Sequence, residues 1–276
     1  MKMVDKCLSG AMNARIMGLG SQTIVLAHGY GGDQSVWDKI LPHLAKHYSV
    51  LVFDWCFSGA VEDPNLFDPL KYTSYAAFAD DLIHLLEEMN IKSSVFVGHS
   101  MSGMIGCIAS VKRPDLFKRL ILIGASPRYM NSDDYEGGFK SGDIEGLISS
   151  IESDFYNWAP AFASIVVDAN DPASVDKFAK CLLRMRPEVA LSVAKTVFYC
   201  DERDTLQKVM TPCTIVQPSK DIVVPNSVAY FMEEKIKGKT TVEVVETDGH
   251  FPQLTSHLEL LNLLSKVLGF DEPENY

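Results

Sequence analysis

The stretch VFVGHSMSG, residues 95–103, joins a β-branched, apolar run to a second apolar run, MIGCIAS, residues 104–110. A strand, a turn of the form G-x-S-x-small and a following helix make up a nucleophile elbow. Gly98 and Ser102 are small, as the pattern requires, because the strand and helix backbones approach closely there. The turn is expected to present the Ser100 hydroxyl beside a helix N-terminus that favours negative charge. An ordinary strand–helix turn fits the bare motif equally well, so the rest of the chain must decide.

The rest of the chain alternates short apolar strands with helical patterns, which is typical of a mostly parallel sheet covered on both faces. Strands are predicted at 23–29, 49–54, 94–98, 120–126, 213–218 and 241–246. The alternation stops over residues 127–203, where the pattern predicts several helices and no strand. We therefore expect a core formed by residues 1–126 and 204–276, with residues 127–203 inserted as a helical layer over one end of the sheet.

The composition of the chain limits the classes of protein to which it can belong. The chain has 276 residues, 47% of them hydrophobic, and a formal net charge of −11. It can build a sizeable core, and it is a poor candidate for nucleic-acid binding because it repels phosphates. No apolar segment has the form of a signal peptide or a membrane span, so no membrane partner is expected. No coiled-coil seam is present either, so we expect a monomer.

The cysteines and the loop motifs indicate that no cofactor is bound. The six cysteines lack metal-type spacing and accompany no export signal. Free thiols in a reducing compartment, the cytoplasm and nucleus, are therefore expected. No Walker loop, no G-x-G-x-x-G after a strand and no His/Cys metal cluster occurs, so neither a metal nor a cofactor is predicted.

A serine hydroxyl becomes a strong nucleophile only when a histidine, oriented by a carboxylate, takes its proton. With an elbow serine the chain order is Ser, acid, His. His250 lies in the loop after the last predicted strand, whereas His257 begins the last helix and is better interpreted as solvated. Asp221 follows the preceding strand. Its rival, Asp248, is so close to His250 in sequence that it more plausibly shapes the turn. We predict a triad of Ser100, Asp221 and His250.

The glycine-rich segment AHGYGGDQSVW, residues 27–37, is the candidate for an oxyanion hole. Taken alone, HGYGG is typical of a flexible loop. Beside an elbow, the backbone N–H groups of Tyr30 and Met101 are placed to stabilise a tetrahedral oxyanion, each contributing about 2.7–4 kcal/mol. His28 is interpreted as a hydrogen-bonded structural residue, and Asp54 as an anchor for the neighbouring loop.

Several longer blocks carry a family resemblance. They are AHGYGGDQSVW (27–37), GHSMSGMIG (98–106), RPDLFKRLILIGASPRYMNSDDYEGGF (113–139), MRPEVALSVAKTVFYCDER (185–203) and DGHFPQLTSH (248–257). Together they resemble the plant strigolactone and karrikin receptor group of α/β-hydrolases, over about Ala14 to Leu268. The segment DWCFSGAVEDP (54–64) is most similar to the DWARF14-like-two branch of that group.

The resemblance implies an α/β-hydrolase fold whose mostly parallel central sheet is capped by a V-shaped lid of four helices, here residues 127–203. It also implies an apolar pocket for a butenolide under the lid. Carried over residue by residue, the pocket lining comprises Tyr30, Tyr129, Phe139, Trp158, Phe162 and Phe198. For each of these aromatic side chains, ordinary packing within the lid is the alternative. Tyr30 departs from the pattern, since relatives commonly have phenylalanine there, and its phenol can narrow the pocket or add a hydrogen bond.

The resemblance favours a slow serine hydrolase that is also the receptor for a butenolide signal, strigolactone-like or karrikin-like. In such receptors the lid shifts and recruits an F-box protein and a repressor protein. Two alternatives remain: a ligand-gated binding module with an idle triad, and a generic metabolic carboxylesterase. A Ser100→Ala variant distinguishes the first alternative, because its signalling would survive without chemistry. The rate distinguishes the second, since metabolic enzymes typically turn over at about 1–1000 per second.

Overall fold

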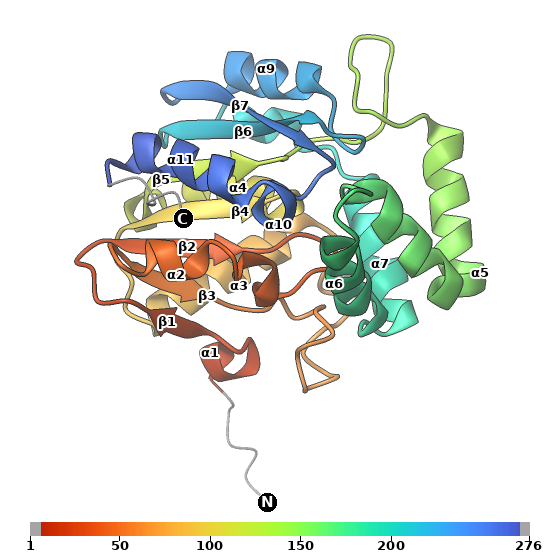
Figure 1. Cartoon of the computed structure of the whole chain (residues 1–276), viewed down its shortest axis with the longest axis horizontal. Coiled ribbons are helices and arrows are strands. Elements are labelled where there is room, and N and C mark those ends of the chain that lie inside the picture. The colour runs from red at the N-terminus through yellow and green to blue at the C-terminus, as the bar shows by residue number, and fades with distance from the viewer. Residues whose placement is uncertain (1–6, 271–276) are drawn as a thin grey trace, which may run out of the picture.

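A seven-stranded sheet forms the centre of the computed structural model, which describes residues 7–270 (Figure 1). The strand order is β1-β3-β2-β4-β5-β6-β7, and every neighbouring pair is parallel except β1 with β3. The strands are β1 (Arg15–Met17), β2 (Thr23–Ala27), β3 (Ser49–Val52), β4 (Ser94–His99), β5 (Phe117–Ile123), β6 (Cys213–Lys220) and β7 (Thr240–Asp248). The outer parts of the predicted core range, residues 1–6 and 271–276, lie outside the described residues.

The mostly parallel sheet predicted from the sequence is confirmed, and strands β2 to β7 correspond to the six predicted ones. The edge strand β1 was missed. It is three residues long and largely exposed, so it has neither an apolar run nor an alternating pattern. The central strands are continuous apolar runs because both faces of the sheet are covered. All six residues of β4, for example, are buried.

Helices on both faces of the sheet complete the core. Figure 1 shows α11 in front of the sheet and α4 behind it. Residues 101–110 of α4 are all buried, which fits a helix packed between the sheet and α3. The core helices are α1 (Leu8–Ala11), α2 (Leu41–Leu44), α3 (Tyr75–Glu88), α4 (Met101–Lys112), α9 (Asn226–Lys235), α10 (Pro252–Thr255) and α11 (His257–Leu268), with short 3₁₀ turns at Gln34–Trp37 and Pro114–Leu116. Within residues 7–270, no helix has the length and apolar character needed to cross a membrane.

Between β5 and β6 the chain forms the predicted helical layer. It consists of α5 (Ser141–Val166), α6 (Pro172–Leu183) and α7 (Pro187–Phe198), followed by the single-turn α8 (Arg203–Leu206). Helix α5 is kinked at Asp154 (φ −155°, ψ 70°), so it comprises two of the expected helices. Figure 1 shows α5, α6 and α7 together at one end of the sheet. We call these three helices the lid. The division of the chain into two domains stays a prediction.

The chain enters and leaves the lid at neighbouring points. The N–H of Glu202 donates to the carbonyl of Pro127 (2.8 Å), which ties the two connections together. Asp201 accepts hydrogen bonds from Arg203 (2.8 Å) and from Arg128 (2.5 Å). The hydrogen bond from Arg203, reinforced by that from Arg128, lowers the pKa of Asp201 to about 2. This ion-paired junction fixes the base of the lid on the core.

Candidate active site

The turn between β4 and α4 has the geometry of a nucleophile elbow. Ser100 adopts φ 56° and ψ −125°, a region that non-glycine residues rarely occupy, and it caps the N-terminus of α4. A Cβ atom on Gly98 would lie 2.6 Å from the backbone carbon and oxygen of Ser102. The strand and helix therefore touch, which is why position 98 requires glycine. Such a backbone costs about 1–3 kcal/mol and is found preferentially at functional sites.

The serine that replaces the second glycine of the motif has a structural role of its own. Ser102 is fully buried, and its hydroxyl donates to the carbonyl of His28 (2.5 Å). The same hydroxyl accepts the indole N–H of Trp55 (2.9 Å). Ser102 thereby connects the elbow helix to the end of β2, where the predicted oxyanion loop begins.

The predicted acid and base lie together. Nδ1 of His250 is 2.7 Å from Oδ2 of Asp221, and the carboxylate side chain is fully buried. The other carboxylate oxygen accepts the backbone N–H groups of Val223 (2.8 Å) and Val224 (3.2 Å). These bonds hold the carboxylate so that it accepts the Nδ1 hydrogen of His250, which leaves Nε2 free to act as a base.

The rival residues lie elsewhere. The carboxylate of Asp248 forms an ion pair with Lys220 (2.8 Å). His257 begins α11, and burial lowers its pKa. The structure thus favours Asp221 over Asp248 as the acid and His250 over His257 as the base.

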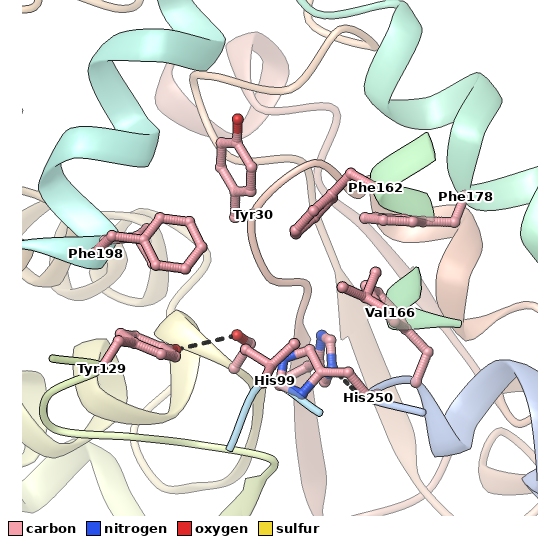
Figure 2. Close-up of a pocket in the computed structure, with 12 residues that line it drawn as sticks. Tyr30, His99, Tyr129, Phe162, Val166, Phe178, Phe198 and His250 are labelled. Carbon is pink, nitrogen blue, oxygen red and sulfur yellow. Dashed lines mark hydrogen bonds between the residues drawn. The ribbon is translucent and has the colours of Figure 1, made fainter. Parts of the chain in front are cut away.

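Among the described residues, no hydrogen bond joins the nucleophile to the base. The Ser100 hydroxyl lies 3.3 Å from the phenol oxygen of Tyr129, the dashed line in Figure 2. Nε2 of His250 is buried without a hydrogen-bond partner among the described residues. Both side chains line one cavity. In ligand-free enzymes such catalytic bonds are often formed only with substrate.

The histidine loop is held from two sides. The backbone N–H of His250 donates to the carbonyl of Val166, the last residue of α5 (2.7 Å), and Gly249 forms a β-bridge with Val167. From the end of β4, Nε2 of His99 donates to the carbonyl of His250 (2.8 Å). Burial lowers the pKa of His99 well below its usual value, so this ring stays neutral. Sequence reasoning missed His99, although its place inside the elbow motif was the available signal.

The predicted oxyanion loop passes directly beside the nucleophile. A Cβ atom on Gly29 would lie 3.0 Å from the Cβ of Ser100. Among the hydrogen bonds of residues 7–270, none uses the backbone N–H of Tyr30 or of Met101, so both donors remain free for a ligand oxygen. His28 has the structural role expected of it, since its ring contacts the Gly29 carbonyl (2.9 Å) and accepts the N–H of Trp55 (3.0 Å).

Asp54, interpreted from the sequence as a loop anchor, accepts the backbone N–H of Gln34 (2.8 Å) just beyond this loop. Its other oxygen accepts the side-chain amides of Asn13 and Gln34 (both 2.9 Å). The carboxylate is thus fully used in holding neighbouring segments together, which agrees with the absence of a catalytic role.

An apolar cavity of about 20 Å³ lies between the triad and the lid (Figure 2). This volume is far below the usual range for ligand pockets, so ligand entry requires the lining side chains to move. The lining residues are Tyr30, His99, Ser100, Tyr129, Phe162, Val166, Phe178, Val197, Phe198, Val223, His250 and Phe251.

Four of the six predicted pocket residues, Tyr30, Tyr129, Phe162 and Phe198, are among them. Phe139 and Trp158 are not among the residues that line this cavity, and their place in a ligand pocket stays a prediction. Phe139 packs edge-on against the Phe198 ring (5.6 Å between centroids), and Trp158 stacks on Phe162 (4.8 Å). Both rings therefore pack against residues that line the cavity. The apolar residues that were missed are Val166, Phe178, Val197, Val223 and Phe251.

Known proteins are similar to this chain in both fold and sequence. A family model described as the alpha/beta hydrolase fold matches residues 22–256. The chain is 43% identical to the protein named strigolactone esterase D14 of Arabidopsis thaliana, covering 94% of this chain and 96% of that protein. It is 40% identical to karrikin insensitive 2 receptor IA of Petunia hybrida, covering 97% and 98%. The solved structure of a hydrolase from Oleispira antarctica superposes with a TM-score of 0.91 at 31% identity, covering 96% of this chain and 97% of that one.

The sheet, the elbow and the His–Asp pair define an α/β-hydrolase, as the sequence predicted. Within that fold, the chain belongs to the family of the strigolactone esterases and karrikin receptors. Its placement in the DWARF14-like-two branch stays a prediction.

Proposed function

We propose that the protein is a slow serine hydrolase that binds a butenolide in the cavity under the lid and serves as its receptor. One observation carries the chemistry: a strained serine and the histidine of a His–Asp pair line the same apolar cavity. The names of the relatives, strigolactone esterase and karrikin insensitive 2 receptor, support the butenolide as the ligand. The family and the elbow argue for an ester or lactone as the reacting group.

The reaction follows from the roles of the residues. The Ser100 hydroxyl attacks the lactone carbonyl carbon while Nε2 of His250 takes the hydroxyl proton. Asp221 stabilises the charged imidazolium. The N–H groups of Tyr30 and Met101 stabilise the oxyanion. The carbon–oxygen bond of the ring then breaks, and His250 returns its proton to the departing oxygen. Water, activated by the same imidazole, releases the acyl group from Ser100.

The hydrogen bond between Ser100 and Tyr129 supports low turnover, because it must be exchanged before the nucleophile reaches His250. The same observation favours the second candidate, a ligand-gated binding module in which the triad is idle. In both cases the receptor output is a contact with an F-box protein and a repressor protein, made by a monomer in the cytoplasm and nucleus. A generic carboxylesterase would instead turn over rapidly on simple esters.

The test uses a fluorophosphonate probe and a fluorogenic butenolide ester, each followed by mass spectrometry of the intact protein. The wild-type chain should gain one probe mass on Ser100, and Ser100→Ala should gain none. His250→Ala should fold, as judged by its melting temperature, and resist labelling. Labelling of His250→Ala at the wild-type rate would refute the triad. Butenolide binding without turnover in the wild-type chain would establish the binding module instead.

A further inference from the structure

The side chain of Tyr30 forms a hydrogen bond that is separate from the role of its backbone N–H in the oxyanion hole. The phenol donates a hydrogen bond to the carbonyl of Ala190 in lid helix α7 (3.0 Å), and both groups are buried. In Figure 2 the Tyr30 hydroxyl points away from the side of the cavity where Tyr129 and His250 lie. This phenol is therefore directed at the lid, and only the ring lines the cavity.

The rest of the oxyanion loop, residues 29–33, is also seated against the lid. Gly31 has φ 76°, and a Cβ atom there would lie 2.7 Å from the Leu182 side chain of α6. Asp33, which is nearly fully buried, forms an ion pair with Arg184 at the end of α6. The loop thus runs between α6 and α7, and the phenol of Tyr30 supplies its contact with α7.

The bonds from the core leave the middle of this loop weakly fixed. The N–H of Gly32 donates to the Gly29 carbonyl at 3.3 Å, which is long for such a bond. The N–H of Tyr30 has no partner in the described part of the chain. An oxyanion-hole donor is effective only when it is held where the charge develops. Some other contact must therefore fix the Tyr30 backbone.

We infer that Tyr30 is a positioning residue for hydrolysis: its phenol, bonded to the Ala190 carbonyl, holds the Tyr30 N–H in the oxyanion hole. The position of α7 then sets the strength of the hole, so movement of α7 alone changes catalysis without displacing the triad. The inference rests on the proposed hydrolysis. Because burial raises the pKa of the phenol, the group keeps its proton and remains a donor at all ordinary pH values.

The test is Tyr30→Phe, which removes one oxygen and keeps the ring that packs in the cavity. The matched control is Tyr48→Phe, because the phenol of Tyr48 also donates to a carbonyl, that of Leu268 (3.2 Å), in a different part of the fold. With p-nitrophenyl acetate, kcat of Tyr30→Phe should fall about 3–10-fold, the equivalent of one hydrogen bond. KM should stay within twofold, since so small an ester makes few contacts with the lid. Tyr48→Phe should keep the wild-type kcat.

Two further measurements exclude a merely structural role. Phenylboronic acid forms a tetrahedral adduct with an active-site serine, so its Kd should rise in Tyr30→Phe by the same factor by which kcat falls. Amide hydrogen exchange should become faster in residues 28–33 and 187–198 of Tyr30→Phe and not of the control. A wild-type kcat in folded Tyr30→Phe, or an equal loss in Tyr48→Phe, would overturn the inference. If the wild-type chain hydrolyses nothing, the proposed function fails, and the exchange measurement alone decides whether the phenol couples loop and lid.

Discussion

Replacing Ser100 by glycine should make the protein more stable than replacing it by alanine. Both variants lose the nucleophilic oxygen, so they differ only in the Cβ atom at a residue with φ 56° and ψ −125°. Alanine keeps the strain of that conformation, whereas glycine adopts it freely. The comparison therefore measures the energy stored in the elbow, independently of any substrate.

The expected size follows from two opposing effects. Strain of this kind costs about 1–3 kcal/mol. Glycine also makes the unfolded chain more flexible, which costs about 0.4–1 kcal/mol. A net gain of about 1 kcal/mol remains for Ser100→Gly over Ser100→Ala, corresponding to about 2 °C in Tm for a chain of this length.

The assay is urea unfolding followed by circular dichroism, with Tm measured in parallel. The unfolding midpoint should rise while the slope m stays constant, since the same surface is exposed. The control pair is Ser110→Gly and Ser110→Ala in the interior of α4, where glycine should be the less stable by about 0.5–1 kcal/mol. If Ser100→Gly is no more stable than Ser100→Ala while the control behaves as expected, the elbow is unstrained and the reasoning from its backbone fails.

Three other changes test separate parts of the structure. Tyr129→Phe should speed labelling of Ser100 by a fluorophosphonate about 2–5-fold, because the hydroxyl loses a competing hydrogen bond worth about 0.5–1 kcal/mol; slower labelling would show instead that the phenol assists the reaction. Asp201→Asn should lower Tm at pH 7 and have little effect at pH 2. The folded-state pKa of Asp201 is depressed, so its stabilising effect is present above the unfolded pKa and lost as pH falls from about 4 to about 2; a Tm difference independent of pH would contradict the ion pair. Gly98→Ala should cost about 1–3 kcal/mol in urea unfolding, because its methyl group would overlap the backbone of α4; a stable variant would mean that strand and helix do not touch.

The sheet, and the end of the sheet at which the predicted triad residues lie, could be predicted because both depend on local pattern and chain order. Continuous apolar strands between helices indicate a covered parallel sheet, and parallel strands place their following loops at one end. Ser100, Asp221 and His250 each follow such a strand, so their convergence needed no knowledge of side-chain packing. The short edge strand β1 was missed because its residues are largely exposed.

The lid side chains that line the cavity could not be predicted, because they depend on how each lid helix is rotated about its axis against the core. Trp158 and Phe162 are four residues apart on α5, so they share one side of the helix and stack on each other. Only Phe162 lines the cavity. The bond from the Tyr30 phenol to Ala190 was equally hidden, since it joins residues 160 positions apart.

The backbone bond from His250 to Val166 has a consequence for domain exchange. The backbone N–H of His250, the base of the triad, donates to the carbonyl of Val166 at the end of lid helix α5, so this bond involves main-chain atoms only. Replacing residues 127–203 with the corresponding segment of another hydrolase would therefore replace the residue that holds the His250 loop as well as the lid residues that line the cavity. Chimeras designed to alter ligand selectivity alone will also alter the catalytic rate, unless the helix that replaces α5 ends where its last carbonyl can accept the N–H of His250.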